Sequence, residues 1–443
     1  MKPVMVVAGT RPEVIKLAPV LRGLNEAGVD YVLVWSGQHY DYLLSQVFFE
    51  EFGLDGADVD LGVGSGSHAQ QTGQIMAGLE GLIGERKPAL VVAEGDTNTV
   101  LAAALTAAKC HVPFAHVEAG LRSWNMLMPE EVNRRVADAV ASLHFAPTEW
   151  AALNLLFEGV SSRSVHVTGN TIVDAVKQFT PRVEELSEKV LGAYGLERGR
   201  YLLVTLHRAE NTDNAERLRG VVEALTELAA HFRVVFPAHP RTRKMLAGLG
   251  LLGRLENAVM LMEPLGYFEF LALLANCLVV LTDSGGVQEE AFTLKVPTVT
   301  LRYNTERPET TMYGVNVLAG AEAYRIVECT LRQAERAGEI RRLSFENPFG
   351  DGEAGRRIAK LLKEAVESGL AVVEPDLRET PIVGYRLLEA DAISNPWIFD
   401  LLAGFSHNGE PCLPSKACGK LLARLKDAGG SKASFNASSA PAA

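Results

Sequence analysis

The chain has 443 residues, a length that suggests two or three domains, and 47% of them are hydrophobic and 22% charged. These values are typical of a globular protein and exclude a disordered or fibrous chain. The formal net charge of −11 argues against nucleic acid as a main partner. Five scattered cysteines form no disulfide pattern, and no segment resembles a secretory signal or a membrane span. We therefore expect a cytoplasmic protein without a membrane partner.

Short apolar runs alternate with helical patterns in the first part of the chain. The runs are apolar throughout, as in parallel strands that helices cover on both faces. Residues 1–180 are therefore predicted to form one doubly wound, Rossmann-like α/β domain. Its expected strands are Val4–Ala8, Tyr31–Trp35, Ala89–Ala93, Val112–Val117 and Val165–Thr168.

The same alternation restarts after an amphipathic stretch, Val183–Gly195, which is predicted to be a connector helix. Residues 181–352 are therefore predicted to form a second α/β domain, followed by an amphipathic helix at about 353–370. Two such domains would face each other across a cleft at the carboxyl ends of their sheets. The expected strands are Tyr201–Leu206, Arg233–Phe236, Val259–Met262, Cys277–Thr282 and Val296–Leu301.

The alternation stops near residue 375. Residues 376–443 have weak periodicity and end in small polar residues, so we expect a disordered end and assign this tail no function. His407, Cys412 and Cys418 are three potential zinc ligands within it. Because a fourth ligand and a CxxC pair are missing, we expect no metal site.

Cations follow the first predicted strand. The segment Gly9-Thr10-Arg11-Pro12-Glu13 comes directly after it, and Lys16 lies one turn further on. Two cations near a helix N-terminus suit an anion such as a diphosphate. A solvated basic pair on a surface helix explains Arg11 and Lys16 equally well.

Carboxylates follow the later strands of the first domain. Asp96 and Glu118 come after strands, and Glu130 and Glu131 open a predicted helix. An acid at a helix start is often only a partner of the helix dipole. Their convergence at one edge of a sheet favours a group of acids with raised pKa values that act as general acids or bases. The role of the nearby His116 is left open.

The second domain places different residues at its strand ends. His207 and His239 each follow a strand, and Asp283-Ser284-Gly285-Gly286 lies between a strand and a helix. There the glycines would let a phosphate approach backbone N–H groups. Glu290 on the same helix can accept hydrogen bonds from ribose hydroxyls. A nucleotide site in one domain and acids in the other point to a nucleotide-sugar enzyme with two Rossmann-like halves.

Seven motifs occur in order, and together they closely resemble the UDP-N-acetylglucosamine 2-epimerase family over about residues 3–370. They are Gly9-Thr10-Arg11-Pro12-Glu13 with Lys16, Gly95-Asp96-Thr97, His116-Val117-Glu118-Ala119-Gly120-Leu121-Arg122, Pro129-Glu130-Glu131 with Asn133-Arg134, Thr205 with His207-Arg208 and Glu210-Asn211, Asp283-Ser284-Gly285-Gly286 with Gln288-Glu289-Glu290, and Thr305-Glu306-Arg307-Pro308-Glu309.

The resemblance implies a GT-B-like fold, a homodimer, a final helix that packs back on the first domain, and no cofactor. It implies inversion at C2 of UDP-N-acetylglucosamine, in which UDP leaves to give 2-acetamidoglucal and then adds back. The product, UDP-N-acetylmannosamine, would supply surface polysaccharide or glycan synthesis. By motif position, the acid and base candidates are Asp96, Glu118 and Glu130, and His207 is catalytic or contacts the diphosphate.

The resemblance also implies a set of residues that bind the UDP-sugar. Among them, Glu290 would hold the ribose, Arg307 the phosphates, and Phe270 would lie near uracil. The set is Arg11, Lys16, Glu131, Arg134, His239, Phe270, Ser284, Gly285, Gly286, Glu290 and Arg307.

The chain departs from the family pattern at a few positions. Asp41 replaces a glutamine of bacterial members that are activated by a second substrate molecule, so allosteric activation is not carried over. Ala209 and Leu265 also differ from the residues usual there. Four alternatives stay open: a hydrolysing relative that releases N-acetylmannosamine, an epimerase for a modified UDP-sugar, a GT-B glycosyltransferase and a non-catalytic binding protein. The motif acids argue against the last two.

Overall fold

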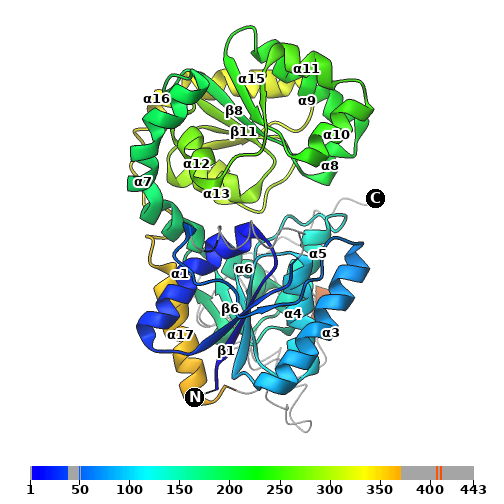
Figure 1. Ribbon diagram of the computed structural model, residues 1–443, viewed down its shortest axis with the longest axis vertical. Helices are drawn as coiled ribbons and strands as arrows, with labels where there is room; N and C mark the ends of the chain where they lie inside the picture. Colours follow the sequence, from blue (N-terminus) through cyan, green and yellow to red (C-terminus); the bar gives the residue numbers. More distant parts are fainter. Residues whose placement is uncertain (1, 38–48, 50, 371–405, 408–409, 412–443) are drawn as a thin grey trace. The chain divides into compact units, whose positions relative to one another are not determined.

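The computed structural model describes residues 2–37, 49, 51–370, 406–407 and 410–411 (Figure 1). Two compact units are present, one made of Met1–Asn154 and His166–Val372, the other of Leu155–Val165 and Val373–Ala443. Asp41, Cys412 and Cys418 lie outside the described residues. So does most of the tail, of which only the antiparallel pair β14 (Ser406–His407) and β15 (Glu410–Pro411) is described.

The first sheet has seven strands in the order β3-β2-β1-β4-β5-β6-β7. The strands from β3 through β6 pair in parallel, and the strand order changes direction between β1 and β4, as in a Rossmann fold. The strands are β1 (Val4–Ala8), β2 (Tyr31–Trp35), β3 (Val59–Asp60), β4 (Leu90–Glu94), β5 (Phe114–Val117), β6 (Leu143–Ala146) and β7 (Val165–Val167).

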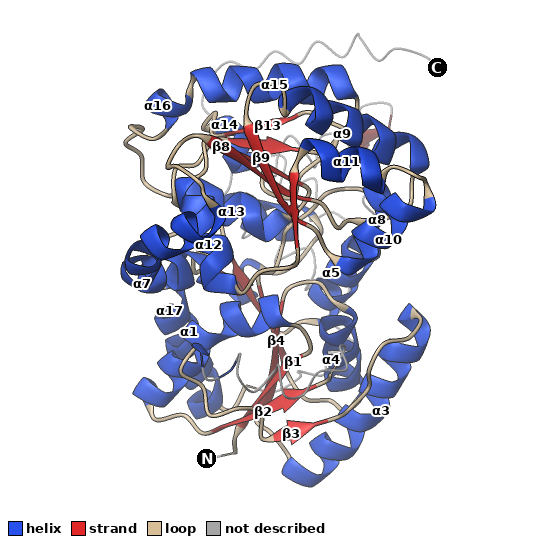
Figure 2. Ribbon diagram, turned by 45° about the horizontal axis from the view of Figure 1, so that its top comes forward, coloured by secondary structure: helices blue, strands red, loops and turns tan. Residues whose placement is uncertain are grey.

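Helices cover both faces of this sheet, and β1 shows why its sequence is apolar throughout. Val4, Val6 and Ala8 belong to a core cluster that includes α1, whereas Met5 and Val7 belong to a second cluster that includes α3 and α4. Figure 2 shows the strands enclosed by helices. The helices of this region are α1 (Arg11–Ala27), α3 (His68–Arg86), α4 (Asn98–Lys109), α5 (Pro129–Val140), α6 (Glu149–Phe157), the 3-10 turn η1 (Ser162–Ser164) and α7 (Thr171–Tyr194).

The helix α17 (Ala354–Ser368) packs along α1, as Figure 1 shows. The two helices approach closely because glycines face the contact. A Cβ on Gly355 would lie 2.5 Å from the carbonyl carbon of Pro19, and a Cβ on Gly23 would lie 2.8 Å from the Cβ of Ala359. Residues near the end of the described chain thus complete the core beside its first helix.

The second sheet has six parallel strands in the order β10-β9-β8-β11-β12-β13. They are β8 (Tyr201–Thr205), β9 (Arg233–Pro237), β10 (Met260–Met262), β11 (Val279–Thr282), β12 (Thr298–Thr300) and β13 (Asn316–Leu318). The helices are α8 (Ala209–Thr212), α9 (Ala215–Leu228), α10 (Pro240–Gly248), α11 (Leu252–Ala258), α12 (Tyr267–Asn276), α13 (Gly285–Thr293), α14 (Pro308–Met312), α15 (Ala323–Glu335) and α16 (Ala337–Ile340).

The predicted α/β class with two parallel sheets is confirmed, and each predicted strand occurs with ends shifted by at most a few residues. The stretch Val183–Gly195, predicted to be a connector helix, is confirmed as helical up to Tyr194, but the helix is longer than expected because α7 begins at Thr171. Residue 180 lies inside that helix, so a domain boundary there stays a prediction. The strands β3, β6 and β13 were not expected, since two to four residues are too few to show a periodic pattern.

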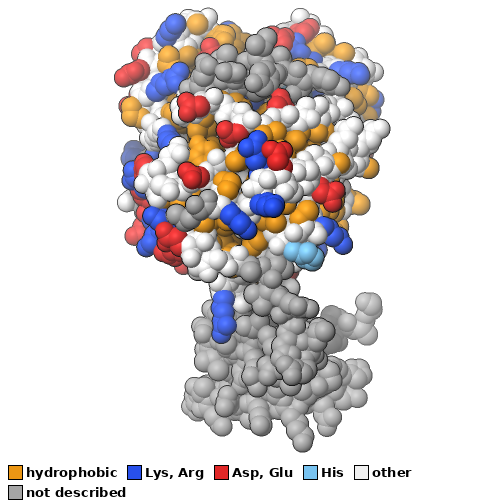
Figure 3. All heavy atoms as spheres, turned by 60° about the horizontal axis from the view of Figure 1, so that its bottom comes forward, with side chains coloured by type: hydrophobic (Ala, Val, Ile, Leu, Met, Phe, Trp, Pro, Cys, Tyr) orange, Lys and Arg blue, Asp and Glu red, His pale blue; other side chains and the backbone are white. Residues whose placement is uncertain are grey.

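On the face drawn in Figure 3, lysines and arginines lie among aspartates and glutamates rather than in one basic patch. Among the helices that the structure describes, none combines the length and the apolar character needed to cross a bilayer.

Candidate active site

Three charged residues meet where β4 and β5 end. Glu94 is the last residue of β4, and Glu118 directly follows β5. Lys16 reaches them from the second turn of α1: its Nζ lies 3.0 Å from Glu94 Oε1 and also contacts Glu118 Oε2. All three residues are buried, so Lys16 contacts both carboxyl groups away from water.

Glu118 also pairs with an arginine from the second half of the first unit. Arg307 donates from Nη2 to Glu118 Oε1 at 2.7 Å and from Nε to Glu289 Oε1 at 2.9 Å. Asn170 donates to the same Glu289 oxygen at 2.9 Å. A Cβ on Gly285 would lie 2.4 Å from Arg307 Nη1, so glycine at the start of α13 leaves room for this guanidinium.

A second arginine gathers carboxylates beside the first group. Arg134 on α5 lies 2.5 Å from Asp96 Oδ2 and 2.7 Å from Glu131 Oε2. Glu131 is fully buried and also accepts hydrogen bonds from the backbone N–H groups of Ser123 and Trp124. It therefore fixes the loop before its own helix, whereas the side chain of Asp96 is 24% exposed.

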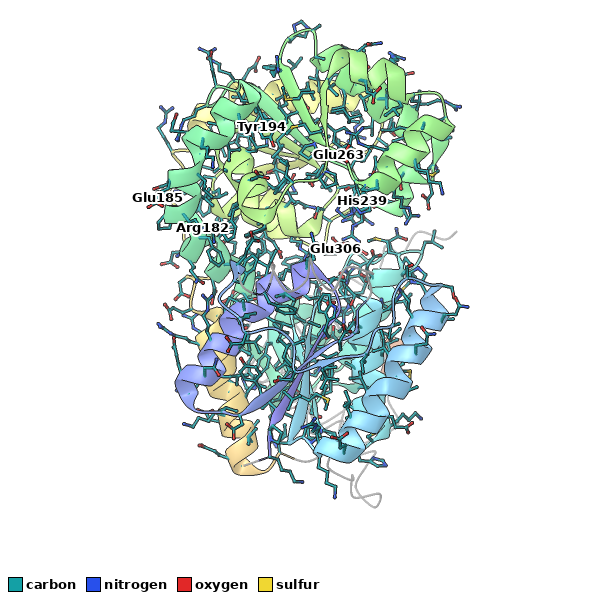
Figure 4. The ribbon with its side chains drawn as sticks, in the orientation of Figure 1. Arg182, Glu185, Tyr194, His239, Glu263 and Glu306 are labelled. Atoms are coloured by element: carbon teal, nitrogen blue, oxygen red, sulfur yellow. The ribbon has the colours of Figure 1, made fainter. Side chains whose placement is uncertain are left out.

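Glu306, which is labelled in Figure 4, joins the two arginine groups. Its carboxylate accepts two hydrogen bonds from Arg302, at 2.7 and 2.9 Å, and one from Arg307 at 3.4 Å. Arg134 lies 3.5 Å from it. Burial would raise the pKa of Glu306, but these cations hold that pKa well below its usual range.

The expectation that the clustered acids share raised pKa values is wrong for Glu118. Burial would raise its pKa, but the charges of Lys16 and Arg307 outweigh burial and hold the pKa well below the usual range. Beside Glu118, raised pKa values occur at Glu94 and Glu289, which the sequence analysis did not select. Burial raises the pKa of Glu94, helped by the charge of Glu118, and raises that of Glu289 to about 7.

Glu130 lies apart from the enclosed group, at the start of α5. Its carboxylate pairs with Arg208, and its side chain is 31% exposed. The neighbouring His207 has a ring that is 44% exposed, with Nε2 3.9 Å from Asp283 Oδ1. Asp283 is buried and accepts hydrogen bonds from the backbone N–H groups of both His207 and Arg208, so it fixes the loop that carries them.

The nucleotide-binding candidates lie on α12 and α13. Ser284 is the N-cap residue of α13, and a Cβ on Gly286 would meet open space. Glu290 is buried further along the helix, and burial raises its pKa to about 7. Phe270 on α12 is half-buried against the core.

Two predicted residues are exposed and outside the enclosed group. Arg11 opens α1. His239 caps α10, where its Nδ1 accepts a hydrogen bond from the backbone N–H of Arg241 at 3.2 Å (Figure 4).

A search against family models matches residues 22–363 to the family described as UDP-N-acetylglucosamine 2-epimerase. The chain belongs to this epimerase family. It is 44% identical over 366 residues to the UDP-N-acetylglucosamine 2-epimerase of Methanocaldococcus jannaschii, covering 81% of this chain and 98% of the relative. It is 40% identical over 368 residues to the UDP-2,3-diacetamido-2,3-dideoxy-D-glucuronate 2-epimerase of Pseudomonas aeruginosa, covering 81% and 99%.

Solved structures of epimerases have the same GT-B-like fold. The M. jannaschii enzyme in complex with UDP-GlcNAc and UDP has a TM-score of 0.75 and 43% identity, covering 82% of this chain and 99% of that one. The Neisseria meningitidis enzyme bound to UDP-GlcNAc also has a TM-score of 0.75, with 34% identity and coverage of 82% and 100%.

The structure adds to the candidate site four charged residues that the sequence analysis did not select: Glu94, Glu289, Arg302 and Glu306. Each lies directly beside or inside a motif that was selected. The position of Glu94, as the last residue before Gly95-Asp96, was a usable signal. Glu289 pairs with Arg307 and Asn170, and Arg134 reaches Glu306, from other parts of the chain, so spacing along the sequence carries no sign of these contacts. Arg302 lies four residues before Glu306, so that pair is close in sequence.

Proposed function

We propose that this epimerase catalyses the reversible inversion of UDP-N-acetylglucosamine at C2 to UDP-N-acetylmannosamine without hydrolysis. The observation that carries the proposal is the grouping of carboxylates and arginines at the strand ends, with Glu118 held between Lys16 and Arg307. A reaction that separates a proton from an anionic leaving group needs both kinds of residue close together. Relatives named as UDP-N-acetylglucosamine 2-epimerases support the same substrate.

In the proposed reaction, a base takes the C2 proton and the C1–O bond breaks, with its electron pair leaving on UDP. The product is 2-acetamidoglucal, which has a C1–C2 double bond. Protonation of C2 on the opposite face and return of UDP to C1 give the other epimer. No net oxidation occurs, so the cycle is complete without a redox cofactor.

The exposure of the three predicted acids suggests different roles. Asp96 and Glu130 are partly exposed, and each contacts an arginine, so a sugar can reach them. Glu118 is enclosed by cations that lower its pKa, which makes it a weak base. We propose that Asp96 and Glu130 exchange protons with C2 and that Glu118 holds Lys16 and Arg307 in place.

The N-terminus of α13 is the proposed site for the diphosphate. Ser284 offers a hydroxyl, the first residues of α13 offer backbone N–H groups, and Arg307 lies directly against Gly285. His207 and Arg208 follow β8 and are proposed to contact the departing phosphate. Glu290 would bind ribose hydroxyls, and Phe270 would lie near the base.

The family resemblance also leads us to propose a homodimer.

The P. aeruginosa relative supports a second candidate substrate. It is named for a diacetamido uronate, yet 40% of its aligned residues are identical to this chain. The same ion pairs could therefore serve a UDP-sugar with a carboxylate at C6, for which an additional cation would be needed. A comparison of the two UDP-sugars at equal concentration decides which one has the higher kcat/KM.

Proton NMR in deuterated water tests the proposed reaction. The protein is incubated with UDP-N-acetylglucosamine, and both the products and the C2 proton signal are followed. The proposal predicts UDP-N-acetylmannosamine with deuterium at C2. Free N-acetylmannosamine and UDP would identify a hydrolysing enzyme instead, and retention of the C2 proton in every species would contradict both reactions.

A further inference from the structure

His116 lies in the middle of β5, is fully buried, and has an acceptor at each ring nitrogen. Its Nδ1 lies 2.6 Å from Asp138 Oδ1, and its Nε2 lies 2.8 Å from the carbonyl oxygen of Gly95. An ionised carboxylate and a carbonyl can only accept hydrogen bonds, so each nitrogen must carry a proton. A neutral imidazole has a single N–H and can satisfy only one of these partners.

The groups around the ring favour the charged form. Asp138 comes from α5, and Arg122 lies 2.7 Å from the other oxygen of the same carboxylate. His144 on β6 contacts the backbone carbonyl of Asp138 at 2.8 Å, and Phe114 stacks near the ring with centroids 6.0 Å apart. Burial would lower the pKa of His116, but the charge of Asp138 and both hydrogen bonds raise it further than burial and Arg122 lower it.

Asp138 is ionised for the same reason. Burial would raise its pKa, but the contacts with His116 and Arg122 hold the pKa well below its usual range. The pair is therefore an imidazolium and a carboxylate rather than two neutral groups. Breaking such a buried pair by removing one partner leaves an uncompensated charge, which is costly.

The two partners each hold a different loop of the candidate active site. His116 binds the carbonyl oxygen of Gly95, which directly precedes Asp96. Asp138 accepts a hydrogen bond from the backbone N–H of Gly120, two residues after Glu118. Gly95 and Glu118 have φ angles of 91° and 69°, and a glutamate in that region is strained unless its surroundings hold it.

We propose that His116 is a permanent imidazolium which, paired with Asp138, positions the two loops that carry Asp96 and Glu118. His116 is thus a positioning residue and does not touch the substrate. The alternative is that His116 is a core residue that fills space and has no influence on the two loops. The expected effect on turnover rests on the proposed function, whereas the charge of the ring does not.

The charge state can be measured directly by ¹⁵N NMR on protein labelled at histidine. The ring of His116 is assigned by its loss in His116→Gln or by contacts with the Phe114 ring. We expect both ring nitrogens to stay protonated from pH 6 to pH 8.5, a range over which a free histidine with a pKa near 6.5 loses its charge. A ring with one unprotonated nitrogen at pH 7.5 would overturn the imidazolium.

Kinetics test the positioning role, with His144→Gln as the matched control, since His144 is a second buried histidine beside Asp138 and its Nε2 lies at the backbone carbonyl oxygen of that residue. We expect His116→Gln to lower kcat about 10-fold or more, because small displacements of catalytic groups are expensive. KM should change by less than about 3-fold, and His144→Gln should keep kcat within about 3-fold. An unchanged kcat in His116→Gln, or an equal loss in both variants, would overturn the role.

Asp138→Asn replaces His116→Gln if that variant fails to fold. The amide removes the charge that favours the imidazolium, so we expect a neutral ring at pH 7.5 together with a lowered kcat. A charged ring and normal turnover in this variant would contradict the proposal. If the wild-type protein catalyses no epimerisation, the proposed function fails, but the NMR result for the ring still stands.

Discussion

The carboxylates of the candidate site fall into two environments. Glu118, Glu131 and Glu306 are buried among arginines or Lys16, whereas Asp96 and Glu130 keep 24% and 31% of their side chains exposed. In the proposed reaction the enclosed carboxylates hold cations and loops in place, whereas the partly exposed ones meet the sugar. A group of acids near a strand end can therefore combine structural and chemical roles that the sequence does not distinguish.

The largest expected effect comes from removing an enclosed charge. Glu118→Gln should lower kcat by about 10²-fold or more and the free energy of unfolding by about 3 kcal/mol, because Lys16 and Arg307 lose a buried partner. Turnover assays and denaturant titration measure both. Glu26→Gln, which breaks an exposed pair with Arg356, is the control and should change neither by much. If Glu118→Gln were as stable as the wild-type protein, Glu118 would not be the buried partner that Lys16 and Arg307 need.

The partly exposed acids should separate activity from stability. Asp96→Asn and Glu130→Gln are expected to lower kcat by about 10²-fold or more, since each removes a group that exchanges protons. Their free energies of unfolding should change by less than about 1 kcal/mol, because neither side chain is fully desolvated. Enzyme assays and thermal melts on the same samples make the comparison. Near-normal turnover in both variants would refute their roles as acid and base.

Two adjacent glycines provide a steric test of the proposed phosphate site. In Gly285→Ala the new methyl group would overlap the guanidinium of Arg307, so we expect a loss of about 1–3 kcal/mol in stability and a higher KM. Gly286→Ala meets open space, and its stability should be unchanged or slightly higher. Equal melting temperatures for the two variants would show that Arg307 does not need the space at Gly285.

The smallest expected effect is the contribution of Glu290 to the pH dependence of the free energy of unfolding. Burial raises the pKa of Glu290 to about 7, above the value near 4.3 of an unfolded glutamate. The folded state therefore binds the extra proton, and the stability from this group is present below pH 4 and is lost as the pH rises to about 7. Glu290→Gln should reduce this fall in the free energy of unfolding by about 1 kcal/mol. If the free energy of unfolding depended on pH in the same way in the variant and the wild-type protein, the raised pKa of Glu290 would be contradicted.

The sequence was sufficient for the parts of the fold that rest on local patterns. The apolar run Val4–Ala8 coincides with β1. The helix α1 begins at Arg11 and has Pro12 in its first turn, as the sequence indicates. The three-residue strand β13 was missed because Asn316-Val317-Leu318 is too short to show a period. The last half of α7 was taken for a separate connector, since its first half was not recognised as part of the same helix.

The sequence predicted individual site residues from their positions after strands, but it did not predict which residues they pair with. Asp96, Glu118 and Lys16 were selected because each follows a buried strand. Their partners in ion pairs come from elsewhere: Arg307 lies 189 residues after Glu118, and Arg134 lies 38 residues after Asp96. The lowered pKa of Glu118 depends on these contacts, which only the folded chain brings together.

Chemical rescue by formate tests the central claim that exposed acids move protons and enclosed ones hold charge. Asp96→Ala, Glu130→Ala and Glu118→Ala would each be assayed for deuterium exchange at C2 of UDP-N-acetylglucosamine, with and without formate. The account predicts that formate restores exchange in Asp96→Ala or Glu130→Ala, where the small acid can enter, and restores none in Glu118→Ala. Recovery of Glu118→Ala, or no recovery in either of the others, would contradict it.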